Sequence, residues 1–142
     1  MNAERELAGG CLCGAVRYHV VGAPLDTYHC HCGMCRRMQG AAFGTYSVWP
    51  AERFALDKGA DAMGHHETSP GSKRHFCRTC GCNVLAWNDA EVDKVWVMTP
   101  TLDGGAAPGG LEALHHIFVG HKAAWYEIRD DYPQWDEWKE ET

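Results

Sequence analysis

The sequence lacks any apolar run near the roughly 20 residues that a helix needs to cross a bilayer. Its first ten residues, MNAERELAGG, also lack the apolar segment of a signal peptide. Basic residues are outnumbered, because 13 Lys and Arg face 19 Asp and Glu and leave a formal net charge of −6. We therefore expect a cytoplasmic protein without membrane insertion. The acidic balance argues against general nucleic-acid binding, which needs a basic face.

Helical periodicity sustained over about ten residues is missing too, and strand patterns dominate. The 142 residues, 45% of them hydrophobic and 23% charged, fit one globular domain. We expect a short turn after Cys35, a loop over 104–110 and a helical piece near 134–140. β-Branched, aromatic and alternating residues predict strands over residues 16–20, 43–49, 95–99 and 116–119. The fold class predicted from these patterns is mainly β.

Cysteine is what the chain has in abundance. Its eight cysteines fall into three tight clusters, at residues 11–13, 30–35 and 77–82. Such clusters place several thiolates within one coordination sphere of about 2.3 Å radius, whereas small disulfide proteins tend to spread their cysteines along the chain. The pattern favours zinc over the alternatives, a disulfide framework or inert buried thiols.

The clusters divide into two candidate zinc sites. A structural zinc takes four ligands, usually as two pairs from distant segments, and the outer clusters supply them: Cys11, Cys13, Cys77 and Cys80. A catalytic zinc keeps three protein ligands and an open fourth position, and the middle cluster supplies these: Cys30, Cys32 and Cys35. We therefore expect two zinc ions per chain.

The sequence leaves two points about the metal ligands open. His31 lies inside the middle cluster and His29 precedes it, so a histidine is an alternative fourth ligand that would make this site structural as well. Cys82 is an alternative ligand in place of Cys77 or Cys80, a free thiol, or a small buried residue.

Taken together, these motifs resemble a known family. They are GCxCGxVxY from Gly10, CHCxxC from Cys30, GxxF from Gly40, RxFCxxCG from Arg74 and HIFVxxKAxW from His116. The sequence resembles the glutathione-dependent formaldehyde-activating enzyme family and its centromere protein V-like members, from Gly10 to Gln134. The resemblance implies one zinc-binding domain over residues 1–142, with its core at about residues 8–135.

The same resemblance implies a zinc-pinned β-tent fold, similar to methionine sulfoxide reductase B. It implies the ligand grouping given above, with Cys30, Cys32 and Cys35 at the catalytic zinc. The implied activity is the condensation of formaldehyde with glutathione to S-(hydroxymethyl)glutathione, a carbon–sulfur lyase reaction. The expected partner is therefore a small-molecule thiol such as glutathione.

The ligand count supports this chemistry. A zinc ion held by three thiolates has a formal charge of −1, acts as a weak Lewis acid towards water, and still binds and deprotonates a thiol. The competing functions are a non-catalytic zinc-stabilised binding module and a redox protein that uses Cys82.

Several further residues are candidates for roles beside the metals. Arg36 and Arg37 are candidates for binding the carboxylates of a thiol substrate. The alternative is charge compensation at the thiolate sites, shared with Lys73, Arg74 and Arg78. The candidate proton donors are His31, His65, His66, His75, Ser69 and Ser72.

The end of the chain is rich in aromatic residues. Large aromatic side chains predict a packed cover over the sheet, and the alternatives are a wall beside a ligand pocket or a contact within a homodimer. These residues are Trp125, Tyr126, Tyr132, Trp135 and Trp138.

Overall fold

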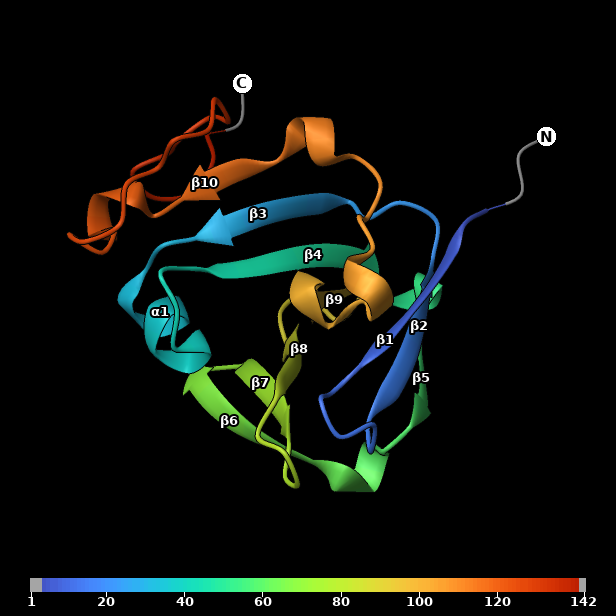
Figure 1. The fold of residues 1–142 in the computed structure, drawn as a ribbon. Helices are drawn as coiled ribbons and strands as arrows, with labels where there is room; N and C mark the ends of the chain where they lie inside the picture. The colour runs from blue at the N-terminus through green and yellow to red at the C-terminus, as the bar shows by residue number, and fades with distance from the viewer. Residues whose placement is uncertain (1–3, 141–142) are drawn as a thin grey trace.

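The computed structural model describes residues 4–140. Its regular elements are almost all strands, and they form two sheets (Figure 1). The strands and the one α-helix of this range are β1 (Glu6–Gly10), β2 (Arg17–Val21), β3 (Asp26–Cys30), α1 (Gly33–Gln39), β4 (Gly44–Pro50), β5 (Phe54–Lys58), β6 (Met63–Ser69), β7 (Ser72–Cys77), β8 (Asn83–Asn88), β9 (Lys94–Met98) and β10 (His115–Ile117). Short 3-10 turns lie at Ala51–Arg53, Ala60–Ala62, Thr99–Thr101, Asp103–Gly105, Leu111–Ala113 and Val119–His121.

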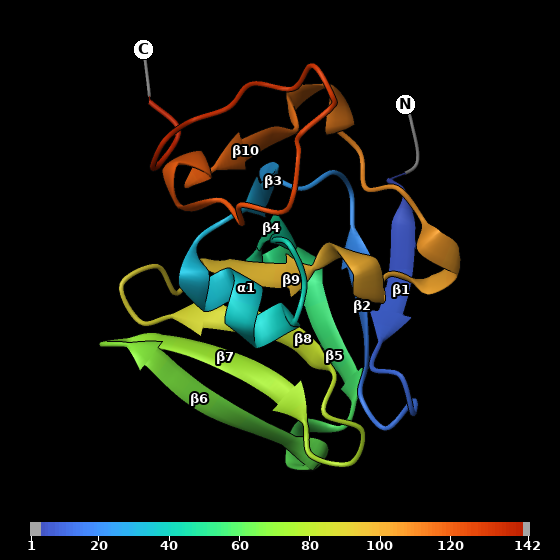
Figure 2. The same cartoon turned by 60° about the vertical axis from the view of Figure 1, so that its left-hand side comes forward.

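The two sheets differ in size. The smaller has the strand order β1-β2-β5, and the larger has the order β10-β3-β4-β9-β8-β7-β6. All neighbouring strands run antiparallel except β10, which pairs with β3 in parallel. Figures 1 and 2 show α1 beside the end of β3 and the start of β4, between that layer and the β6–β7 hairpin. The candidate site lies in this region, where α1, the β3–β4 layer and the β6–β7 hairpin come together.

One hydrophobic core lies between the two sheets. In β2, Tyr18 and Val20 are buried, while Arg17 and His19 point away from the core, as the two-residue alternation predicts. Trp49 of β4 is fully buried in the same core. The apolar face of β2 thus holds the small sheet against the large one.

A second core covers the opposite face of the large sheet. Tyr46 and Val48 of β4 are buried in it, together with Tyr28 and Cys30 of β3 and Ile117 of β10. Because β4 is a central strand that packs on both faces, nearly all of its residues are buried. This second core forms the floor of the candidate site.

The mainly β prediction is confirmed, and the four expected strands correspond to β2, β4, β9 and β10. The turn expected after Cys35 forms the body of α1. No helix of residues 4–140 has the length and apolar character to cross a membrane.

The helix predicted near 134–140 is wrong, because that segment is irregular. The backbone N–H of Trp135 donates to the carbonyl of His116, and the N–H of Phe118 donates to the carbonyl of Glu137. Backbone groups that an α-helix would pair internally are therefore used to hold the tail against the β10 segment.

Candidate metal centres

The first candidate centre joins two distant turns. Cys11 and Cys13 lie in the turn between β1 and β2, and Cys77 and Cys80 lie at and after the end of β7. Their four Sγ atoms all lie within 4.8 Å of one another. The Sγ atoms of Cys11 and Cys13 are 3.7 Å apart, as are those of Cys13 and Cys77. The group draws together the four outer cysteines that the sequence analysis assigned to a structural site.

These separations fit a metal ion. A tetrahedron with zinc–sulfur bonds of about 2.3 Å has sulfur–sulfur edges of about 3.8 Å, close to the 3.7 Å observed. A disulfide would need about 2.05 Å, and all eight cysteines are free. In addition, the backbone N–H of Val16 donates to the Cys11 Sγ at 3.3 Å, which stabilises a thiolate there.

The second candidate centre lies at the start of α1. Cys30 ends β3, Cys32 is the N-cap of the helix, and Cys35 lies in its first turn. Their three Sγ atoms lie within 4.8 Å of one another, with 3.5 Å between those of Cys30 and Cys32. The backbone N–H of Cys35 donates to the Cys32 Sγ at 3.3 Å. The local fold therefore places three thiols where one ion could contact them all.

The electrostatics of this cluster favour ionisation at one sulfur. Hydrogen bonds from Cys30 and Cys35 lower the pKa of Cys32 to about 2. The same close contacts raise the pKa of Cys30. A lowered pKa at one of the sulfurs suits a cation site, because metal ligands must be deprotonated.

The neighbouring histidines are engaged elsewhere. His31 is fully buried, and its Nε2 shares a 2.8 Å hydrogen bond with the Nδ1 of His116, whose Nε2 lies 3.0 Å from a carboxylate oxygen of Asp130. The Nδ1 of His29 lies 2.7 Å from the Thr45 hydroxyl. In the described range, the metal-ligand group at the start of α1 contains the three cysteines alone. The geometry therefore favours a three-sulfur site.

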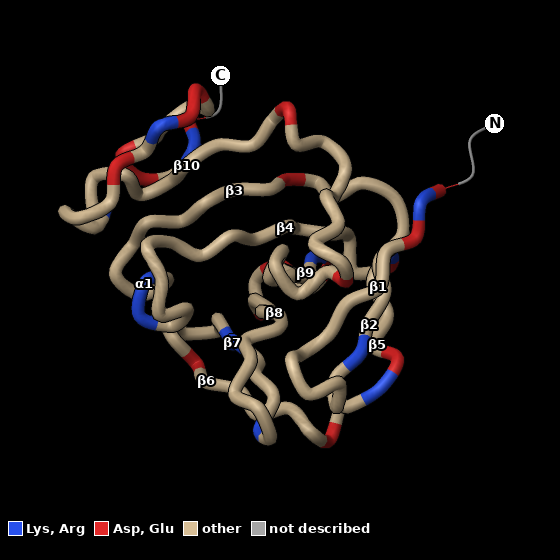
Figure 3. The backbone as a smooth tube through the Cα atoms, viewed as in Figure 1, with Lys and Arg blue, Asp and Glu red and all other residues tan. Residues whose placement is uncertain are grey.

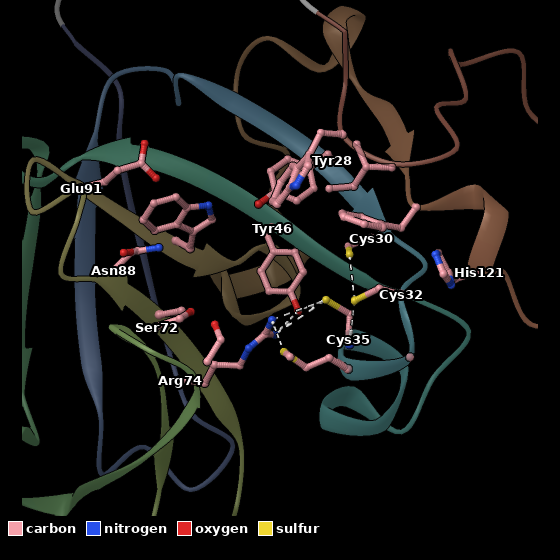
Figure 4. Close-up of a pocket in the computed structure, with 18 of the residues that line it drawn as sticks. Tyr28, Cys30, Cys32, Cys35, Tyr46, Ser72, Arg74, Asn88, Glu91 and His121 are labelled. Atoms are coloured by element: carbon pink, nitrogen blue, oxygen red, sulfur yellow. Dashed lines mark hydrogen bonds between the residues drawn. The ribbon is translucent and has the colours of Figure 1, made fainter.

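A cavity of about 610 Å³ opens beside this three-sulfur group. Figure 4 shows Cys30, Cys32 and Cys35 at one end of it, with Asn88 and Glu91 at the other. Strands β3, β4, β7, β8 and β9, helix α1 and the C-terminal tail all contribute to the lining. The second centre therefore faces space for a ligand.

Arg74 and Tyr46 approach the three-sulfur group from the cavity side (Figure 4). The Tyr46 hydroxyl donates to the Cys35 Sγ at 3.1 Å and accepts from the Arg74 Nη1 at 2.7 Å. The two Nη atoms of Arg74 lie 3.7 and 3.8 Å from the same sulfur. Gly44 makes room for this arrangement, because a Cβ there would lie 2.7 Å from the Tyr46 hydroxyl.

The charge of Arg74 is directed at the sulfurs. None of the ion pairs found within residues 4–140 includes Arg74, although its side chain is partly buried. Burial opposes its charge, but Tyr46 and Cys35 outweigh it and raise the pKa of Arg74. Burial also raises the pKa of Tyr46, so its hydroxyl remains a donor at neutral pH. Arg74 thus supplies positive charge beside the three-sulfur group.

The other basic candidates lie outside the cavity. Arg36 and Arg37 form a basic stretch on α1 (Figure 3), and neither is among the described lining residues. The Arg36 Nε donates to the carbonyl of His31 at 3.4 Å. Lys73 and Arg78, which flank the β7 cysteine, are not in the lining either. Arg74 is therefore the one basic candidate that the structure brings to the cavity.

The candidate proton donors separate in the same way. Ser69 and Ser72 line the cavity, whereas His31 and the hairpin histidines do not, within the part of the chain that the structure describes. The rings of His65 and His75 instead face each other across β6 and β7, with centroids 5.3 Å apart. His121, which the sequence analysis did not single out, lies in the lining (Figure 4).

The aromatic tail has two roles in the structure. Trp135 packs against the second core, as a cover over the sheet should. Trp138 is 66% exposed and lines the cavity, with its ring against Phe118 at a centroid distance of 5.2 Å. Phe118 adopts a left-handed backbone with φ 56°, which is costly for a residue with a side chain.

Cys82 belongs to neither sulfur group. Its Sγ lies 3.5 Å from the carbonyl of Asn83, and burial raises the pKa of its thiol. It is a partly buried free cysteine that is poorly disposed to ionise.

Comparison with known proteins places the chain in a family. A sequence model described as "Glutathione-dependent formaldehyde-activating enzyme" matches residues 6–121, a range that contains both sulfur groups. The chain belongs to the glutathione-dependent formaldehyde-activating enzyme family. The resemblance noted in the sequence is confirmed by this match.

One curated relative carries the name of this family, and one solved structure has a similar fold. A protein from Halomonas elongata, named "Putative glutathione-dependent formaldehyde-activating enzyme", is 28% identical over 129 residues, which cover 86% of this chain and 80% of that protein. A crystal structure of a Rhodobacter sphaeroides protein superposes with a TM-score of 0.60 at 25% identity, covering 77% of this chain and 98% of that one.

Proposed function

We propose that this protein is a zinc-dependent carbon–sulfur lyase that acts on thiol adducts of small carbonyls. The observation that carries the proposal is a three-sulfur group open to a cavity, separate from a closed four-sulfur group. A closed site of four ligands suits a structural ion, whereas three ligands beside a cavity leave room for a substrate atom. Family membership supports glutathione and formaldehyde as the reactants.

The residues at the two centres have different roles in this proposal. Zinc bound at the second centre supplies a site at which a substrate thiol is held as its thiolate at neutral pH. Cys30, Cys32 and Cys35 are the residues that would hold the ion there. The four sulfurs of the first centre would join the β1–β2 turn to the end of β7 and contribute to the free energy of folding.

Arg74 and Tyr46 complete the site electrostatically. Three cysteine thiolates and a substrate thiolate with a divalent ion would carry a formal charge of −2. The Arg74 guanidinium would offset part of it, since its Nη atoms lie 3.7 and 3.8 Å from the Cys35 Sγ. Tyr46 donates to Cys35 and so draws charge away from that sulfur. Both residues lower the cost of bringing an anionic thiol into the cavity.

In the condensation, the substrate sulfur forms a bond to the carbonyl carbon. The carbonyl π electrons move to the oxygen, which takes up the proton that the thiol lost, so the product is a hydroxyalkyl thioether and nothing else is released. Ser72 lines the cavity and offers a hydroxyl for this proton transfer. Cleavage of the adduct is the same sequence in reverse.

The proposal also includes the location of the protein in the cell and its oligomeric state. We place the protein in the cytoplasm, where a reducing pool keeps these free cysteines available for metal and supplies a thiol substrate such as glutathione. A homodimer in solution also belongs to the proposal, and sedimentation of the purified protein tests it.

The test is exchange between formaldehyde, glutathione and their adduct, followed by nuclear magnetic resonance with the zinc-loaded protein. We expect the wild-type protein to accelerate exchange over buffer and Cys32→Ser to abolish the acceleration. Cys82→Ser is the matched control, since this cysteine is partly buried but outside both sulfur groups, and it should exchange at the wild-type rate. Wild-type exchange equal to that in buffer, or undiminished exchange in Cys32→Ser, would overturn the proposal.

A further inference from the structure

Six of the 19 residues that line the cavity beside the second centre, among those the structure describes, are Phe, Trp or Tyr. Tyr28 and Tyr46 form its floor, and Trp96 packs against the same core and also lines the cavity. Phe118 and Trp138 contribute further rings from the chain after β10. Aromatic walls of this kind favour apolar and ring-bearing ligands through buried area and ring contacts.

Charged groups are few in the same lining. Among its described residues the only Lys or Arg is Arg74, and its Nη atoms are already directed at Tyr46, Met34 and Cys35. The far end presents the carboxylate of Glu91, which is paired with Lys94 at 3.0 Å. Glutathione brings two carboxylates and one ammonium group, and this lining offers its carboxylates little positive charge.

The cavity lining includes one aromatic ring that is largely exposed to solvent. Trp138 is 66% exposed and contacts Phe118 edge to face. Phe118 is the only residue other than glycine with a positive φ among residues 4–140, at 56°. Two rings in contact thus line the cavity, one on a strained backbone and one exposed to solvent, and both features are found at ligand-binding sites.

From these features we infer that the substrate thiol carries an apolar, ring-bearing substituent and that Trp138 and Phe118 contact it. This inference rests on the proposed function and specifies its thiol. The reaction stays balanced as before: the sulfur–carbon bond forms, and the thiol proton passes to the carbonyl oxygen. The substituent occupies the aromatic part of the cavity while the sulfur lies among the three cysteines.

The test measures thiol binding to the zinc-loaded protein by calorimetry, under anaerobic conditions. The probes are phenylmethanethiol, which carries one ring, glutathione, and 2-mercaptoethanol, which has no ring. We expect phenylmethanethiol to bind about tenfold or more tightly than glutathione, which corresponds to about 1.4 kcal/mol.

Two tryptophans of the tail provide a matched pair of variants. Trp138→Ala should weaken phenylmethanethiol binding about two- to tenfold and leave 2-mercaptoethanol unchanged, since only the former reaches the ring. Trp125→Ala removes a tryptophan that is 76% exposed and absent from the described lining, and it should change neither affinity. Both positions are exposed, so the fold should tolerate both changes.

The outcomes separate a failure of this inference from a failure of the proposed function. If glutathione binds as tightly as phenylmethanethiol and is turned over, the inference is wrong while the proposed function stands. If Trp138→Ala weakens both ring-bearing and ringless thiols equally, the inference is likewise wrong. If no thiol binds and no exchange is catalysed, the proposed function fails together with it.

Discussion

Replacement of Tyr46 by Phe removes one hydroxyl from the edge of the second centre. That hydroxyl donates to the Cys35 Sγ at 3.1 Å and accepts from the Arg74 Nη1 at 2.7 Å. A hydrogen bond to a charged group contributes about 1.5–3 kcal/mol. We therefore expect zinc affinity at the three-sulfur site to fall about 10- to 150-fold, with the four-sulfur site unchanged.

The assay is competition for zinc with a chromophoric chelator, in which the two sites appear as separate steps. Tyr18→Phe is the matched control, because the Tyr18 hydroxyl is also buried but bonds to Thr101, 2.7 Å away in the first core. Tyr18→Phe should lower the free energy of unfolding without changing the zinc affinity of the three-sulfur site. An unchanged zinc affinity of the three-sulfur site in Tyr46→Phe would refute the role assigned to the Tyr46 hydroxyl.

Three further predictions address other parts of the account. Cys13→Ser should reduce bound zinc from two ions to one and lower the midpoint of unfolding, whereas Cys82→Ser should keep both ions by mass spectrometry; equal loss in the two variants would refute the grouping of the sulfurs. Arg74→Gln should weaken thiolate binding in calorimetry, and Arg37→Gln, on an exposed side of α1, should not; equal effects would show that only overall charge matters. A carboxylate on β5 raises the pKa of His19, so this histidine stabilises the fold below about pH 6.5 and the contribution disappears as pH rises through the raised value. Denaturant unfolding at pH 6 and pH 9 should therefore show His19→Gln less stable than wild type by up to about 1 kcal/mol at pH 6 only, and a gap that widens with pH would contradict this.

The cysteine groups could be predicted from the sequence because their chemistry is local. The CHCxxC run places Cys30, Cys32 and Cys35 around one helix start, and a four-ligand zinc leaves the outer cysteines as the complementary set. Strands with clear alternation, such as β2, were predictable for the same reason.

The rest of the site depends on long-range pairing that no local pattern encodes. Arg74 reaches Cys35 because β7 pairs with β8 and β8 with β9, and this register follows from the whole bent sheet. The β6–β7 hairpin is rich in His, Lys and Arg, and its sequences MGHHETS and SKRHFC show no apolar alternation, so sequence analysis missed both strands. A helical piece was predicted near residues 134–140, but the backbone of this segment hydrogen-bonds to the β10 segment instead.

The central claim is that two separate metal sites exist and that only the one beside the cavity accepts a thiol. Native mass spectrometry of the zinc-loaded protein, with and without added thiol, tests it most directly. The account predicts two zinc ions and one bound thiol per chain for the wild-type protein, and one zinc ion without thiol for Cys32→Ser. A wild-type chain that holds a single zinc ion, or a Cys32→Ser chain that still binds the thiol, would contradict it.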